Sequence, residues 1–179
     1  MNIFKRKIYN KLLEWKNCSN GTRGLLLEGA RRVGKSTIVK EFAENEYRSY
    51  IFIDFDEEGE EIRKIFDAGF HDLDSLFRSL SLYYHTELFP RQSLIVFDEV
   101  QRFPRAHEGR KYLIKDGRYD FIETGSLITL KLLSKGFTNP SEVDYLSRYP
   151  MDFEEFLMAR GDTVSYPRIK DAFESRKPL

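Results

Sequence analysis

The chain has 179 residues, 41% of them hydrophobic, and its 29 basic and 29 acidic residues give a net charge of zero. This length and composition fit one globular domain with the start of a second, and exclude a disordered or collagen-like chain. Zero net charge disfavours a protein that coats nucleic acid or membranes through bulk electrostatics. Its single cysteine, Cys18, excludes an intrachain disulfide, and its three scattered histidines indicate no metal site. No apolar run reaches the roughly 18 residues of a membrane span, so we expect a cytoplasmic protein.

Hydrophobic periodicity predicts helices and strands that alternate along the chain. In chain order they are a helix from Phe4 to Trp15, a strand at 25–28, a helix from Ser36, a strand at 50–53, a helix from Leu73 to Tyr84, and strands at 94–97, 119–124 and 144–149. Such alternation predicts an α/β fold whose mostly parallel sheet is covered by helices on both faces.

Residues 29–36 read Gly-Ala-Arg-Arg-Val-Gly-Lys-Ser and match the pattern G-x-x-x-x-G-K-[ST] in full. Gly29 and Gly34 let the backbone turn its N–H groups inward toward phosphate oxygens. The helix that follows presents unpaired N–H groups and the positive end of its dipole, which favour an anion. The pattern therefore predicts a nucleotide phosphate bound by Gly29, Ala30, Arg31, Arg32, Val33, Gly34, Lys35, Ser36 and Thr37.

Three side chains of this loop have separate expected roles. Lys35 reaches the β- and γ-phosphates, and the Ser36 hydroxyl is a Mg²⁺ ligand, while Thr37 adds a contact to the α-phosphate. The alternative is a chance match, with odds of roughly one in a hundred in a chain of this length. The context speaks against chance, because the motif follows a predicted strand and opens a predicted helix.

The apolar strand at 94–97 ends in Asp98-Glu99. A carboxylate at the tip of a buried strand beside a phosphate loop can hold Mg²⁺ through water, and we assign this role to Asp98. Glu99 can then accept a proton from an attacking water. The alternative is that both residues merely end a strand at the surface. The pair favours hydrolysis by water over transfer to a small metabolite, because phosphotransferases often lack the second carboxylate.

The next strand ends in Thr124-Gly125-Ser126, which brings two hydroxyls to the same edge of the sheet. Thr124 and Ser126 are expected to lie near the γ-phosphate or the attacking water and to sense them. The alternative is an ordinary turn after a strand, since Thr, Gly and Ser are common in turns.

Four blocks of the sequence, in this order, resemble the prokaryotic AAA-type ATPases, which carry an uncharacterised C-terminal domain. They are 29–36, then Ile-Val-Phe-Asp-Glu-Val-Gln-Arg-Phe-Pro at 95–104, Ile-Glu-Thr-Gly-Ser-Leu at 122–127, and Tyr-Pro-Met-Asp-Phe-Glu-Glu-Phe-Leu at 149–157. The resemblance implies ATP, Mg²⁺ and a three-layer P-loop NTPase fold. Its five-stranded sheet would hold the Thr124 strand between the 25–28 and 94–97 strands. Residues 1–150 would be the ATPase domain and 151–179 a helical segment leading to a further domain, so we expect an N-terminal fragment.

Many members of this family carry a Gly-Arg pair shortly before the Tyr-Pro block, and this chain departs from that pattern at 140–148. The arginine finger is therefore not identified by the resemblance. Arg148 is the nearest candidate by position and Arg118 the next, and either is expected to act only across a subunit interface. The alternative is that both are surface arginines.

Charge is unevenly distributed along the chain. Residues 54–67 contain seven acidic and two basic residues, and residues 101–118 contain six basic and two acidic ones. The basic stretch could touch nucleic acid or face the acidic stretch of a neighbouring subunit. Because aromatic residues are not interleaved with the basic ones, a subunit contact is the better supported of the two. The alternative is two unrelated solvated helix faces.

These patterns leave three hypotheses for the function. The favoured one is an ATPase whose hydrolysis of ATP changes how the C-terminal region engages a partner. The second is a nucleotide-gated binding module with negligible turnover, and the sequence does not separate it from the first. The third is a small-molecule phosphotransferase, which the Asp98-Glu99 pair disfavours.

Overall fold

The computed structural model describes residues 6–67, 69–126 and 142–178 of the chain. Phe4 of the first predicted helix lies outside these ranges, and so do residues 140 and 141. In chain order the elements are α1 (Lys7–Ser19), β1 (Gly24–Gly29), α2 (Lys35–Glu46), β2 (Ser49–Asp54), α3 (Glu60–Asp67), α4 (Leu73–Tyr83), β3 (Ser93–Asp98), the 3₁₀ turn η1 (Val100–Arg102), α5 (Pro104–Asp116), β4 (Asp120–Ser126), β5 (Val143–Arg148), α7 (Phe153–Ala159) and α8 (Ser165–Ser175).

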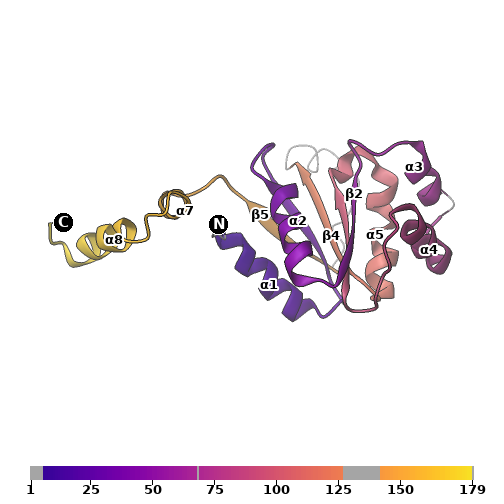
Figure 1. Ribbon diagram of the computed structural model, residues 1–179, viewed down its shortest axis with the longest axis horizontal. Helices are drawn as coiled ribbons and strands as arrows, with labels where there is room; N and C mark the ends of the chain where they lie inside the picture. Colours follow the sequence, from indigo (N-terminus) through magenta and orange to yellow (C-terminus); the bar gives the residue numbers. More distant parts are fainter. Residues whose placement is uncertain (1–5, 68, 127–141, 179) are drawn as a thin grey trace.

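The five described strands form one sheet in the order β2-β3-β4-β1-β5. Every neighbouring pair in this sheet is parallel. The α/β class is therefore confirmed, and so is the position of β4, which carries Thr124, between β1 and β3. A parallel sheet needs long connections between its strands, and from β1 to β4 these connections contain the helices α2 to α5 (Figure 1).

Helices cover the sheet on both faces, which explains why its central strands are almost entirely buried. One core lies under α1 and α2 and includes Leu25, Val96 and Ile122. The other lies under α3, α4 and α5 and includes Leu26 and Phe97. Every residue of β3 and β4 is buried. Figure 1 shows α1 and α2 on the opposite side of the sheet from α4 and α5.

Two helices at the C-terminal end lie beyond the sheet, as the expected helical segment after residue 150 requires (Figure 1). α7 begins with a capping box in which Asp152 and Glu155 exchange hydrogen bonds between side chain and backbone N–H. No residue of α8 is buried, and Phe173 is 84% exposed. Within the described residues no helix has the length and apolarity to cross a membrane.

The acidic and basic stretches contact each other within one chain. Arg102 pairs with Asp56 at 2.8 Å, and Arg105 pairs with Asp67 at 3.2 Å. The topology explains these contacts, because α3 and α5 cover the same face of the sheet. Two half-exposed ion pairs thus connect the acidic and basic stretches within the chain. These four side chains already have partners without a second subunit.

Candidate nucleotide-binding site

The carboxyl ends of parallel strands meet at one edge of a sheet, and the predicted loop lies there between β1 and α2. The backbone of Gly34 is left-handed, with φ 82°, and Arg32 has φ 63°. Gly34 suits this conformation because it has no Cβ. Gly29 is required for a different reason: a Cβ there would lie 2.4 Å from the carbonyl oxygen of Arg148 on β5. The two glycines thus shape the loop and let β5 pass close to it.

Lys35 is a buried cation at the start of α2, with 4% of its surface exposed. Its Nζ donates hydrogen bonds to the carbonyl oxygens of Ala30, at 3.1 Å, and Gly29, at 3.4 Å. No carboxylate in the described part of the chain forms an ion pair with it. A buried ammonium without a counter-charge favours the binding of an anion beside it.

Asp98 lies across from the loop at the end of β3 and is 1% exposed. Burial raises the pKa of its carboxyl group, and the charges of Asp54 and Glu99 act in the same direction. Hydrogen bonds from Ser36 and Thr124 oppose this rise. The structure therefore brings together the two expected Mg²⁺ ligands, Ser36 and Asp98. Both offer oxygen atoms, which Mg²⁺ prefers, so this donor set fits the ion.

Glu99 follows β3 at a turn in the chain. Its backbone is left-handed, with φ 49° and ψ 44°, a conformation that is rare for residues other than glycine. Its N–H donates to Thr124 Oγ1 at 3.3 Å, and Gln101 Nε2 donates to its carboxylate. The carboxylate is half-buried and held at the sheet edge that carries Asp98.

The other predicted residues lie either at the loop or away from it. Ser126 is 5% exposed and pairs in register with Gly29, so it lies at the base of the loop. Thr37 is exposed on the first turn of α2, and Ala30 and Arg31 are exposed at the loop tip. Arg118 lies away from the site, because it precedes the amino end of β4 and pairs there with Asp74 and Asp116.

Arg148 contacts the loop of its own chain. It pairs in register with Gly29, is 6% exposed, and its Nε donates to the carbonyl oxygen of Val33 at 3.0 Å. Burial lowers the pKa of its guanidinium, and the nearby charge of Arg6 adds to this effect, while Glu155 opposes it. Arg148 reaches this loop because β5 is the direct neighbour of β1, whereas its expected action across a subunit interface stays a prediction.

A cavity of about 720 Å³ opens beside the loop tip, between Ala30–Val33 and the segment 150–156. Its lining includes Arg6 and the rings of Phe153 and Phe156, which are 56% and 47% exposed. Sequence reasoning did not place Arg6 or this segment at the site. The capping-box residues Asp152 and Glu155 were a readable signal for a helix start there, but not for its distance from the loop.

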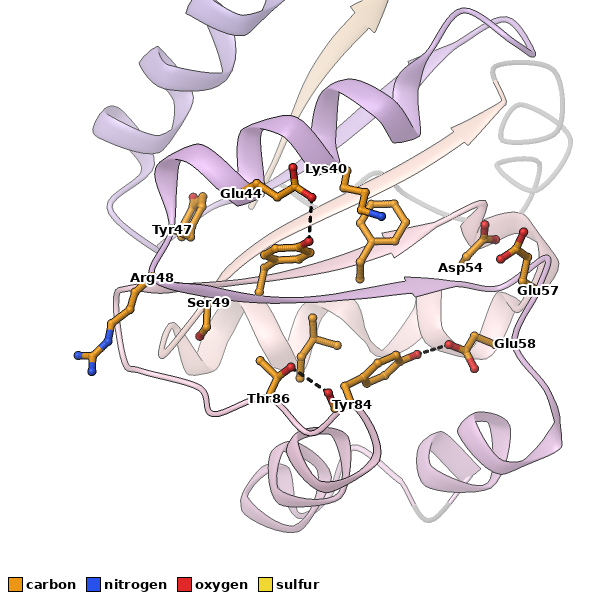
Figure 2. A pocket seen from close by; sticks show the side chains of 13 residues that line it. Lys40, Glu44, Tyr47, Arg48, Ser49, Asp54, Glu57, Glu58, Tyr84 and Thr86 are labelled. Carbon is orange, nitrogen blue, oxygen red and sulfur yellow. Dashed lines mark hydrogen bonds between the residues drawn. The ribbon is translucent and has the colours of Figure 1, made fainter.

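A second cavity, of about 750 Å³, lies along β2 at the far edge of the sheet (Figure 2). Its walls include Lys40 and Glu44 from α2, and Tyr84 and Glu58 from below the sheet. Side chains there bond to one another, as Tyr84 does to Glu58 in Figure 2. Although it is slightly larger, this cavity does not touch the loop, so its size does not make it the nucleotide site.

Two solved structures have a similar fold. A chain from the structure of Drosophila ORC bound to AT-rich DNA and Cdc6 is 14% identical, with a TM-score of 0.51 over 90% of this chain and 61% of that one. AMPPCP-bound DnaA from Aquifex aeolicus is 11% identical, with a TM-score of 0.51 over 99% of this chain and 55% of that one. This chain thus spans less than two thirds of either, and the likeness concerns the fold.

No curated protein matches the chain in sequence. Residues 22–157, however, match the profile of a family described as an AAA domain. The match begins just before β1 and ends inside α7, so it includes the loop, the Asp98 strand and the Thr124 strand. The chain therefore belongs to the AAA domain family, as an ATP-binding domain of the P-loop type.

Proposed function

We propose that this chain is a cytoplasmic, Mg²⁺-dependent ATPase that hydrolyses ATP to ADP and phosphate. The observation that carries the proposal is a pair of buried charges joined through Ser36, which follows Lys35 in the chain and hydrogen-bonds to Asp98. Lys35 is a cation with no carboxylate ion-pair partner among the described residues, and Asp98 is a carboxylate whose burial disfavours its charge. Triphosphate would supply the anion that Lys35 needs, and Mg²⁺ would supply the counter-charge that Asp98 needs.

Each residue of the site has a part in the proposed reaction. The loop N–H groups and Lys35 bind the β- and γ-phosphates, and Ser36 and Asp98 hold Mg²⁺. When bound, the ion neutralises charge on the transferring phosphoryl group. Glu99 accepts a proton from the attacking water. Thr124 orients the Asp98 carboxylate through the hydrogen bond between them.

The cavity at the loop tip suits the base of the nucleotide. It adjoins the loop directly, and its exposed apolar lining includes Met151, Phe153 and Phe156. Aromatic and thioether side chains give a flat base the apolar contact area it needs. Segment 150–156 also leads into α7. We therefore propose that nucleotide binding changes the position of the helices after residue 150, which form a unit separate from the ATPase domain.

One observation favours a second candidate, a nucleotide-gated binding module with negligible turnover. Gln101 bonds to the Glu99 carboxylate, which occupies an oxygen that a catalytic base would need. ATP binding would then proceed as proposed while hydrolysis is slow.

Self-association and a nucleic-acid partner are further proposals. Phosphate release measured with and without DNA, over a range of protein concentrations, tests both.

The central test is the variant Lys35→Ala. Without the ammonium, the terminal phosphates lose their main cation, so affinity for a labelled ATP analogue is expected to fall by about a hundredfold or more. Lys40→Ala is the matched control, because Lys40 is an exposed lysine on the same helix. Equal affinity in the Lys35 variant and the parent would defeat the assignment of this loop.

A further inference from the structure

Arg148 is a second buried cation at the phosphate loop. Its side chain is 6% exposed, and no carboxylate in the described ranges forms an ion pair with it. Its Nε instead donates to the carbonyl oxygen of Val33 at 3.0 Å. A Cβ on Gly34 would lie 3.5 Å from Arg148 Nη2, so the guanidinium also lies beside the next residue of the loop.

This contact controls the orientation of one peptide group. The peptide bond between Val33 and Gly34 is planar and trans, so its C=O and N–H point in opposite directions. When Arg148 holds the carbonyl on the β5 side of the loop, the N–H of Gly34 must point to the other side. A phosphate-binding loop works by aiming successive N–H groups at phosphate oxygens. The hydrogen bond from Arg148 thus prepares a donor for phosphate.

The same geometry argues against a role in a neighbouring subunit. An arginine finger has to extend away from its own fold to reach phosphate bound by another chain. For Arg148 that movement would break its bond to Val33 and remove a guanidinium packed between β5 and the loop. The absence of a Cβ at Gly29 lets the backbone of its register partner Arg148 lie against the start of the loop, which brings the Arg148 side chain within reach of Val33.

We infer that Arg148 is a positioning residue for the phosphate loop of its own chain. The inference rests on the proposed function, since it assumes that the loop binds ATP. A positioning residue differs from an arginine finger in its effects. It strengthens the binding of both ATP and ADP rather than the chemical step, and it needs no second subunit.

The test compares nucleotide affinities of three variants. Arg148→Ala is expected to bind both ATP and ADP about ten- to a hundredfold more weakly, the effect of losing one charge-assisted hydrogen bond. Arg148→Lys keeps a cation and a donor and should recover most of the affinity. Arg23→Ala is the control, because Arg23 pairs with Asp144 at the opposite end of the β1–β5 strand pair. Chemical unfolding of each variant shows whether it is folded.

A mixing experiment separates positioning from a finger. Arg148→Ala has an intact Lys35, and Lys35→Ala has an intact Arg148, so a finger acting between subunits would restore turnover in a mixture of the two. We expect no restoration. Regained turnover, or unchanged ATP affinity in Arg148→Ala, overturns the inference and leaves ATP binding intact. If Arg148→Ala does not fold, the ATP affinity of Arg148→Lys is compared with that of the parent. A loss of more than a hundredfold, like that of Lys35→Ala, would contradict the inference, because lysine also supplies a cation and a hydrogen-bond donor. A parent protein that binds no ATP would instead defeat the proposed function itself.

Discussion

Thr124 connects the Asp98 carboxylate at the end of β3 to the backbone of Glu99. Its hydroxyl donates to Asp98 and accepts from the N–H of Glu99, at 3.3 Å for the latter. From the sequence it is expected to sense the γ-phosphate directly, whereas in the structure its hydrogen is given to Asp98. Because this hydrogen bond fixes the orientation of the Asp98 carboxylate, we propose that Thr124 acts on the nucleotide indirectly, through the proposed Mg²⁺ ligand.

We therefore expect Thr124→Val, which keeps the shape but removes the hydroxyl, to impair the use of Mg²⁺. It leaves one N–H and one carboxylate oxygen without a partner in a buried place, at a cost of about 1–3 kcal/mol in unfolding free energy. The Mg²⁺ concentration for half-maximal ATP binding should rise several-fold, and affinity without Mg²⁺ should stay. Thr163→Val, at an exposed threonine between α7 and α8, is the control. Unaltered Mg²⁺ dependence would show that Thr124 has no such role.

The proposed base is tested by Glu99→Gln. The amide is nearly the same size but accepts no proton at neutral pH, so ATP binding should persist while hydrolysis falls by about 10²–10⁴-fold. Phosphate release and binding of a labelled analogue are measured on the same preparation. A variant as fast as the parent would make Glu99 a structural residue and favour the binding module.

Asp98 gives a prediction about stability and pH. Burial raises the pKa of its carboxyl group above 3.8, so the folded state binds a proton more readily than the unfolded state. Above its folded pKa, the buried charge therefore reduces stability, and this loss disappears as the pH falls toward 3.8. In the absence of Mg²⁺ we expect Asp98→Asn to melt at a higher temperature than the parent at pH 7, with a difference that shrinks as the pH falls toward 3.8. A less stable variant at pH 7 would contradict the role of burial.

At the scale of secondary structure, the start of α7 is attached to the start of α1 through three carboxylates, of which Glu155 is the buried one; Lys7 Nζ also pairs with the half-exposed Asp152 and with Glu154. Glu155 is 5% exposed, accepts from the N–H groups of Lys7 and Asp152, and pairs with Arg6 at 3.0 Å. Burial alone would raise the pKa of Glu155, but the bonds from Arg6, Lys7 and Asp152 outweigh it, and the pKa lies below its ordinary 4.5. The stabilisation from this lowered pKa is thus complete above pH 4.5 and lost as the pH falls through the folded pKa.

Glu155→Ala is expected to release the start of α7. It removes half of the capping box, a loss of about 0.5–2 kcal/mol for the helix, together with the contacts of Glu155 to Arg6 and Lys7. The more exposed pairs of Lys7 with Asp152 and Glu154 remain and contribute less. Proteolytic cleavage within residues 149–157 should accelerate by roughly tenfold while the sheet unfolds at an unchanged urea concentration. Glu174→Ala removes an exposed pair with Lys170 on α8 and serves as control. Equal cleavage rates in all three proteins would show that α7 is held by other contacts.

How far the sequence predicts the elements depends on the contacts that each one makes. β1 and β3 are visible because burial on both faces makes most of their residues apolar in one continuous run. α5 gives no such signal, because it contains Gly109 at a place where a Cβ would collide with the ring of Phe70, and Arg110, which is buried against Glu123. A glycine and a charged residue on the buried face weaken the helical pattern, and only the tertiary contacts explain them.

Some residues of the candidate site are likewise predictable from local sequence, whereas others depend on contacts between distant parts of the chain. Local spacing identifies the loop and the acidic strand end, since phosphate binding and metal binding each need a short continuous motif. Strand order came from the family resemblance rather than from periodicity. Neither the spacing nor the resemblance places Arg6 or gives the direction of Arg148. Arg6 contacts Tyr149, 143 positions along the chain, and Arg148 contacts Val33, 115 positions away. Side-chain contacts of this range leave no pattern in a single sequence.

At the scale of the whole molecule, the placement of the arginines sets the expected rate of hydrolysis. The two predicted arginine-finger candidates both have partners within the chain. Arg148 hydrogen-bonds to Val33 in the phosphate loop. Arg118 pairs with Asp74 and Asp116 beyond the amino end of β4. An arginine finger contributes roughly 10³–10⁵ in rate. Without one, the phosphate loop, the metal ligands and the base can bind ATP tightly and still hydrolyse it slowly.

We therefore predict tight ATP binding with slow turnover per chain, at a rate that does not change as protein concentration rises. Binding needs only residues that the structure brings together in one chain, whereas fast chemistry needs a further cation at the phosphoryl group, worth about 4–7 kcal/mol of barrier. Phosphate release is followed over a hundredfold range of concentration, with Lys35→Ala as the blank. A rate per chain that climbs with concentration would reveal a residue supplied by a second copy. Fast turnover at every concentration would mean instead that the site is complete within one chain and that Arg148 serves both the loop and the reaction.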